Sequence, residues 1–224
     1  MINAAAEKNP AETGGRSDRK IIDYNLKEEL EHGVYVSSLV RELTAELGLA
    51  ENSAYQLRLA GLLHDIGKLQ LTNYLYGREE IASPLVIEEM KYVRMHPVLS
   101  WNILKDLGYS DIVLDAVRYH HEDFDGSGYP DHLVGEAIPL GARIIRVCDV
   151  FAALTSDRPY RERFEPDEAM SLMIDEIKHF DLRIFLAFQR VVHRGTSRFR
   201  VHFPITDESI LAEAAARFPA GRNG

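Results

Sequence analysis

The feature that most constrains this chain is a set of histidine and aspartate residues on the apolar faces of helical segments. Side chains at i, i+3, i+4 and i+7 share one face of an α-helix. His64 follows Leu57 and Ala60 at this spacing, and Asp149 follows Ile145 in the same way. The pattern turns five histidines and two aspartates toward the interior: His32, His64, Asp65, His96, His120, His121 and Asp149.

Such a set of buried polar groups needs a shared partner, because an isolated buried carboxylate is costly unless it is paired or metal-bound. A single inward histidine is more often a satisfied core residue, so the argument depends on the number. Imidazole and carboxylate together suit divalent metals, and seven ligands exceed those of one tetrahedral zinc. The set therefore indicates two metals. Glu28, four residues before His32, would permit a third, or is a solvated charge beside Lys27 and Glu29.

Between about residues 20 and 195, helical patterns alternate with turn signals, and neither strand alternation nor an internal repeat is found. Ser110 is the expected cap of a helix that begins at residue 111. Pro97 is expected to break or redirect the helix that reaches it. We predict an all-α fold with a short irregular or β element near the C-terminus, at 198–203. The expected parts are a flexible tail, a domain and a C-terminal extension, at 1–19, 20–195 and 196–224.

Composition and charge exclude several classes of protein. The net charge of −9 argues against a general binder of the nucleic acid backbone. The single cysteine, Cys148, excludes an internal disulfide, suits a reducing compartment and is expected in the core. No run approaches the roughly 18 apolar residues of a membrane span, and the N-terminus lacks the apolar region of a secretory signal. We expect a cytoplasmic protein that binds no membrane and no nucleic acid polymer.

Five segments carry a resemblance to a known family: LLHDIGK at 62–68, MHP at 95–97, HHEDFDGSGYP at 120–130, IPLGARIIRVCDVFAALTS at 138–156 and RPYR at 158–161. In order and spacing they resemble the HD-GYP family, the bacterial cyclic-di-GMP phosphodiesterase branch of the HD metal-dependent phosphohydrolases. The resemblance covers roughly residues 22–190. The HHExxDGxGYP motif is long and specific, whereas a His-Asp pair alone would be weak evidence.

The resemblance implies an HD-domain helical bundle around a central site with two metals, or three if Glu28 contributes, and Fe or Mn as the expected ions. The ligands would be His32, His64, Asp65, His96, His120, His121 and Asp149, with Asp65 bridging two ions. Lys68 matches a lysine beside the scissile phosphate, so Asp65 and Lys68 are the expected catalytic residues. The remaining matches are substrate-binding residues: Asp125, Gly126, Gly128, Tyr129, Arg158 and Arg161.

The expected reaction is hydrolysis of cyclic-di-GMP to pGpG, continuing to GMP if the product is cleaved again. A metal-bridging hydroxide would attack phosphorus. One alternative is a catalytically weak receptor that binds a cyclic dinucleotide or a protein. Another is a phosphohydrolase acting on a different cyclic dinucleotide, such as 3′,3′-cGAMP. Partner proteins of the GGDEF type or other signalling proteins would bind through the GYP surface.

The chain departs from the family pattern in three places. Ala152 stands where the family commonly has Asp, which removes a contact to the site or to the substrate. The segment 69–83 differs from the usual loop after HDIGK and has two tyrosines, so the lid of the pocket is expected to differ. The 19 residues before the domain are too few for a receiver, PAS or GAF domain.

Overall fold

The computed structural model describes residues 26–71, 93–157 and 162–195. Within these ranges the chain forms seven α-helices and no β-strand, so the all-α prediction is confirmed. The 1–19 tail, the candidate strand at 198–203 and the rest of the 196–224 extension lie outside the described residues. The proposed division of the chain into three parts stays a prediction. No helix in the described ranges is long and apolar enough to cross a membrane.

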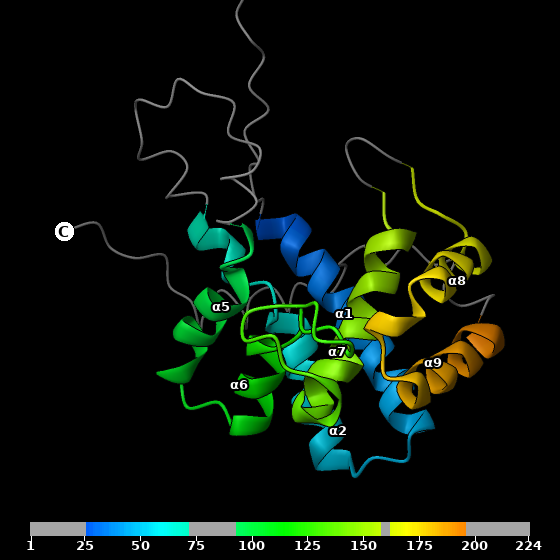
Figure 1. Ribbon diagram of the computed structural model, residues 1–224. Helices are drawn as coiled ribbons and strands as arrows, with labels where there is room; N and C mark the ends of the chain where they lie inside the picture. Colours follow the sequence, from blue (N-terminus) through cyan, green and yellow to red (C-terminus); the bar gives the residue numbers. More distant parts are fainter. Residues whose placement is uncertain (1–25, 72–92, 158–161, 196–224) are drawn as a thin grey trace, which may run out of the picture.

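Three central helices are flanked by a helix pair on either side (Figure 1). The central helices are α1 (Leu26–Glu46), α2 (Glu51–Leu63) and α7 (Leu140–Thr155). One flank holds α5 (His96–Lys105) and α6 (Asp111–Arg118), and the other holds α8 (Pro166–Asp175) and α9 (Leu182–Gly195). Two short 3₁₀ helices, η1 (Gly135–Ala137) and η2 (Ile177–His179), precede α7 and α9.

Local chemistry explains where α5 and α6 begin. The Oγ of Ser110 accepts a hydrogen bond from the backbone N–H of Val113 at 3.5 Å, which caps α6 as predicted. Pro97 lies in the first turn of α5, after a turn at residues 94 and 95. A proline is tolerated there because its missing N–H would have no partner within the helix. This agrees with the expected interruption of the helical pattern.

The apolar core holds the central helices in place. Phe151 of α7 packs edge-on against Phe188 of α9, with 5.1 Å between ring centroids, and both are fully buried. Leu39 and Leu43 of α1 are also fully buried in this cluster. Each such side chain stabilises the fold by about 1.5–3 kcal/mol. Because Asp149 and Phe151 share α7, the packing of the core also fixes the position of Asp149.

Helices α1 and α2 approach each other closely at Gly33. A Cβ at this position would overlap the carbonyl oxygen of Leu62, so a glycine is required. The close approach places His32, next to Gly33, beside His64 at the end of α2, with 5.3 Å between the ring centroids. The packing of the two helices therefore brings residues that are far apart in sequence into one site.

Candidate metal centre

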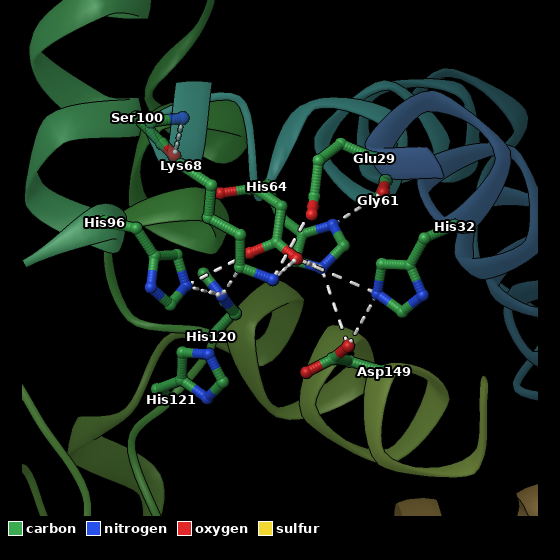
Figure 2. A network of polar contacts seen from close by, with 12 residues as sticks. Glu29, His32, Gly61, His64, Lys68, His96, Ser100, His120, His121 and Asp149 are labelled. Carbon is green, nitrogen blue, oxygen red and sulfur yellow. Dashed lines mark hydrogen bonds and ion pairs between the residues drawn. The ribbon is translucent and has the colours of Figure 1, made fainter. Parts of the chain in front are cut away.

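The expected metal ligands come from separate stretches of the chain and converge at the centre of the fold (Figure 2). They are supplied by α1 (His32), the end of α2 (His64 and Asp65), the start of α5 (His96), the segment after α6 (His120 and His121) and α7 (Asp149). Five of the seven are buried, and His32 and His121 are half-buried. The site is therefore largely shielded from water.

The donor atoms fall into two groups. In each group, one candidate ligand atom per residue lies within 4.8 Å of all the others. One group holds Asp65, His96, His120 and His121, and the other holds His32, His64 and Asp149. Figure 2 shows His96, His120 and His121 on one side of the site, and His32 and Asp149 on the other. Two donor groups of nitrogen and oxygen atoms fit the two divalent cations inferred from the sequence.

Asp65 faces both groups. Its Oδ1 lies 3.0 Å from Nε2 of His96 and 3.7 Å from Nε2 of His120. Its Oδ2 lies 3.3 Å from Nε2 of His64 and 3.8 Å from Nε2 of His32. Each oxygen therefore serves one group, which is the arrangement that a carboxylate bridging two cations requires.

Three of the histidines are oriented by their own backbone. In His64, His96 and His120, Nδ1 lies 2.8, 2.6 and 2.7 Å from a carbonyl oxygen three residues earlier, those of Gly61, Val93 and Val117. A carbonyl oxygen only accepts, so Nδ1 carries the hydrogen and Nε2 presents its lone pair to the site. Metal-binding histidines are commonly held in this way.

The contacts between these lone pairs fit a site that holds a cation. Nε2 of His96 lies 3.2 Å from Nε2 of His120, although each ring has its hydrogen on the other nitrogen. Buried Nε2 of His64 and Oδ1 of Asp65 make no hydrogen bond. An unsatisfied buried polar atom costs about 1–3 kcal/mol. Divalent cations between these atoms would satisfy all of them, so the residues fit the metal ions typical of HD domains.

The protonation states also suit metal binding. Burial opposes charge on Asp65 and Asp149, but His64 beside Asp65, and the hydrogen bonds of His32 and His64 with Asp149, keep the pKa of both carboxyls well below the usual range. Burial, together with neighbouring imidazoles, holds the pKa of His120 and His121 well below 6.5, so both stay neutral. Burial would also lower the pKa of His64, but the Asp65 and Asp149 carboxylates raise it to about 10. The two carboxylates therefore favour positive charge beside His64, and a bound cation would supply it in place of a proton on Nε2.

Lys68 places a positive charge beside the donor groups. Its Nζ contacts Oδ2 of Asp65 and lies 3.6 Å from Oε2 of Glu29. Burial disfavours the ammonium, but Asp65 and Glu29 raise the pKa of Lys68 above its usual range. Lys68 therefore remains charged and close to the site, and its expected role beside the scissile phosphate stays a prediction.

Glu29, and not Glu28, is the glutamate that faces this site. Glu28 is exposed to solvent, whereas the side chain of Glu29 is only 14% exposed and lies beside Lys68 (Figure 2). The expected role of Glu28 at a third metal stays a prediction, and Glu29 is the glutamate that lies beside Lys68. Relative to His32 the two residues stand at i−4 and i−3, and both spacings place a side chain on the same helical face. Spacing alone could not separate them.

The glycine-rich loop brings an aromatic ring to the edge of the metal site. The ring of Tyr129 stacks on that of His121, with centroids 4.8 Å apart and an interplanar angle of 21°. The guanidinium of Arg94 lies 5.5 Å from the centroid of Tyr129. A Cβ at Gly128 would overlap the backbone nitrogen of Asp123, so this position also requires a glycine.

Asp125 and Gly126 shape the loop and belong to neither donor group. Oδ1 of Asp125 accepts hydrogen bonds from N and Oγ of Ser127, at 3.0 and 2.6 Å, while Oδ2 lies 3.7 Å from Nζ of Lys178. Gly126 has φ of +85°, a value that disfavours residues with a side chain. Their expected contact with substrate stays a prediction.

Several expectations concern positions outside or beneath the site. Arg158, Arg161 and residues 72–83 of the altered loop lie outside the described residues. Ala152 is fully buried in the apolar core, as is Cys148, whose thiol pKa is raised by burial.

Sequence reasoning missed Arg146, which lies three residues before Asp149 on the same face of α7. The i, i+3 spacing to Asp149 was the signal that could have found it.

Comparison with known proteins identifies a family. A model of the HD domain matches residues 1–184. A cyclic di-GMP phosphodiesterase of Pseudomonas aeruginosa is 39% identical over 162 residues, which cover 72% of this chain and 38% of the relative. The 3′3′-cGAMP-specific phosphodiesterase 1 of Vibrio cholerae is 36% identical over 169 residues, 74% of this chain and 38% of the relative. The chain thus spans well under half the length of these relatives.

Solved structures show a similar fold. An HDG"Y"P protein of Bdellovibrio bacteriovorus matches with a TM-score of 0.58 and 22% identity, over 74% of this chain and 52% of that one. A cyclic GMP-AMP specific phosphodiesterase of V. cholerae matches with a TM-score of 0.58 and 19% identity, over 83% and 50% of the two chains. At these identities the likeness concerns the fold.

Proposed function

We propose that this chain, which belongs to the HD domain family and carries the HD-GYP motifs, is a metal-dependent phosphodiesterase that hydrolyses cyclic-di-GMP to pGpG. The observation that carries the proposal is the meeting of two His/Asp donor groups on either side of one carboxylate, Asp65. The curated relatives at 39% and 36% identity are cyclic-dinucleotide phosphodiesterases, which supports the same class of substrate.

The donor groups suit hydrolysis because of what bound cations supply. Divalent metals here would polarise the phosphoryl oxygens and lower the pKa of a coordinated water. The chain itself holds the ligand nitrogens in place through backbone carbonyls, as at His64 and His96. It also keeps the Asp65 and Asp149 carboxyls ionised. The positions of these groups are therefore set before substrate arrives, which favours electrostatic catalysis.

Lys68 is the residue that we assign to the phosphate. Its ammonium remains charged in a mostly buried position beside Asp65. A charge in such a position stabilises negative charge on a phosphoryl oxygen more strongly than it would in water. Tyr129 offers one aromatic face, backed by His121, on which a guanine base can stack.

The relatives include phosphodiesterases for cyclic-di-GMP and for 3′,3′-cGAMP, so they do not separate the two substrates. Our choice of cyclic-di-GMP therefore rests on the HD-GYP motifs of the chain. The two molecules differ in one purine base, while their phosphodiesters are alike. The metal groups and Lys68 serve both equally. Discrimination therefore depends on contacts to the bases, and a substrate panel must decide it.

The test is turnover by protein purified without oxygen and loaded with Fe(II) or Mn(II). Cyclic-di-GMP and 3′,3′-cGAMP are supplied in parallel, and products are separated by chromatography. Asp65→Ala removes the carboxylate between the donor groups, and Asp175→Ala, at an exposed position of α8, is the matched control. We expect metal-dependent pGpG from the natural chain and from Asp175→Ala, and none from Asp65→Ala.

Other outcomes would replace the proposal. Preferred hydrolysis of 3′,3′-cGAMP would keep the enzyme class and change the substrate. Tight binding of cyclic-di-GMP without product, in protein that holds its metals, would indicate a receptor. Product formation that persists in Asp65→Ala would mean that the site lies elsewhere.

A further inference from the structure

We infer that Arg146 is a positioning residue that holds His121 in the metal site by clasping the loop after α6 to α7. The inference rests on the proposed function only in taking His121 as a metal ligand. Arg146 precedes Asp149 by one helical turn, so the two side chains leave α7 on the same face. Arg146 thus links α7, which supplies Asp149, to the loop that supplies His121.

Arg146 forms a buried ion pair with Asp123, and we call this ion pair the clasp. Nε and Nη2 of Arg146 both donate to Oδ1 of Asp123, at 3.0 and 2.7 Å. The side chains are only 18% and 12% exposed. On the other side of the guanidinium, Nη1 lies 3.4 Å from Nδ1 of His121. A guanidinium only donates, so this contact cannot orient a metal-binding imidazole, and the ion pair with Asp123, two residues after His121, is what holds the loop.

His121 depends on the position of its loop because its ring is oriented differently from those of the other histidines. His64, His96 and His120 each have Nδ1 against a carbonyl oxygen three residues earlier. The described contacts of the His121 ring are instead with side chains, including Arg146 at Nδ1 and Tyr129 on its face. The orientation of His121 is therefore set by the tertiary structure, and the clasp is its link to α7.

The charge of Arg146 is balanced by a neighbouring carboxylate. Asp123 is 8% exposed and pairs with the guanidinium directly, so the clasp is close to neutral as a unit. Arg146 therefore acts on His121 by fixing the position of the loop that carries it. Loss of the clasp frees the loop, and His121 then occupies its place in the donor group for less of the time.

Arg143 provides a matched control on the same helix. Its Nη1 donates to Oδ2 of Asp181 at 2.6 Å, and the two side chains are 14% and 10% exposed. The pair resembles that of Arg146 and Asp123 in chemistry and burial but contacts none of the metal ligands in the described structure. A purely structural role for Arg146 would make Arg146→Gln and Arg143→Gln equivalent.

The experiment is a Mn(II) titration of the full chain by calorimetry, with electron paramagnetic resonance of the bound ions and melting temperatures for each variant. We expect Arg146→Gln to weaken one of the two Mn(II) sites, the one to which His121 belongs, by about 10- to 100-fold, the usual effect of losing a group that orients a ligand. Arg143→Gln should lower the melting temperature and leave both affinities and the Mn(II) spectrum unchanged.

A double variant distinguishes the loss of the ion pair from the effect of leaving Asp123 buried without a partner. Asp123→Asn with Arg146→Gln removes both charges, so no buried carboxylate is left without a partner. We expect it to fold and still to bind Mn(II) weakly, because the clasp is lost. Natural affinity in the double variant, or equal losses in Arg143→Gln, would overturn the inference. Because metal binding is measured without substrate, an inactive protein would refute the proposed function and leave this test intact.

Discussion

At the residue scale, the site is held ready by contacts made before any ion binds. His64, His96 and His120 are oriented by carbonyl oxygens of their own segments. Asp65 then lies among the Nε2 atoms of four histidines, at distances from 3.0 to 3.8 Å. This arrangement is costly without a cation and favourable with one, which is how a fold can select for metal binding.

Glu29 offers a test at this scale, because its neighbour Glu28 has the same side chain on the solvent side. We expect Glu29→Gln to lower kcat/KM for cyclic-di-GMP by roughly 10-fold, since a carboxylate beside Lys68 and Asp65 is removed. Glu28→Gln should leave it unchanged. Steady-state kinetics and metal analysis of both variants decide the matter. A larger loss in Glu28→Gln would place that residue at the site instead.

Glu28 and Glu29 also show how much a sequence can reveal about the position of single side chains. His32, His64, His120 and Asp149 were found because each breaks an apolar helical face, whereas Asp65, His96 and His121 were found with the motifs of the family. Glu28 and Glu29 lie in a polar turn of α1, where either spacing to His32 is compatible with the helix. Arg146 and Asp123 pair across 23 residues of chain, and such a pairing depends on how α7 meets the loop.

At the element scale, the distance between α1 and α2 decides whether His32 can reach the second donor group. Gly33 allows the backbones to meet at Leu62. In an exposed helix, replacing glycine by alanine stabilises by roughly 1 kcal/mol. Here the sign should reverse, because the added methyl group overlaps a carbonyl oxygen that cannot move away alone.

We therefore expect Gly33→Ala to destabilise the protein by about 1–3 kcal/mol, the usual cost of overpacking. Separation of α1 from α2 should also weaken Mn(II) binding, because His32 moves with α1. Urea unfolding and Mn(II) titration measure the two effects. A more stable Gly33→Ala variant would show that helix propensity prevails and that the helices can separate at little cost.

A second contact between elements gives a pH dependence. Glu46 at the end of α1 accepts hydrogen bonds from Arg190 and Arg194 of α9, which hold the pKa of its carboxyl below 4.5. Its contribution to stability is complete above the unfolded value and is lost as the pH falls through the folded value. Glu46→Gln should slightly lower the melting temperature at pH 7, and the difference should shrink below about pH 4.5. A constant difference across this range would exclude the ion pair as its cause.

Helix positions were more predictable than helix contacts. Ser110 and Pro97 mark their helix boundaries through local chemistry, and both were found from the sequence. The glycine-rich loop was also expected. Its internal contacts were not, such as the hydrogen bonds from Ser127 to Asp125, whose expected contact with substrate stays a prediction. A motif names the residues of a loop without showing which of them face the site.

At the scale of the whole molecule, the metal site joins parts of the chain that are distant in sequence. His32 and Asp149 are separated by 117 positions, and their side chains lie 2.9 Å apart. Ligands on α1, α2, α5 and α7, and on the segment after α6, surround the same small volume. A cation bound there holds all of these elements together, so metal binding and global stability should be linked.

This linkage gives the last prediction. A ligand that binds only the folded state at 100 times its dissociation constant adds about 2.7 kcal/mol of stability. For a domain of this size that corresponds to a rise in melting temperature of roughly 5–10 °C. We expect this rise on adding Mn(II) to metal-free protein, and a much smaller rise in Asp65→Ala, which lacks the carboxylate that faces both groups. Differential scanning calorimetry measures both. Equal shifts in the two proteins would mean that Mn(II) stabilises the fold from a different site, because only the central site depends on Asp65.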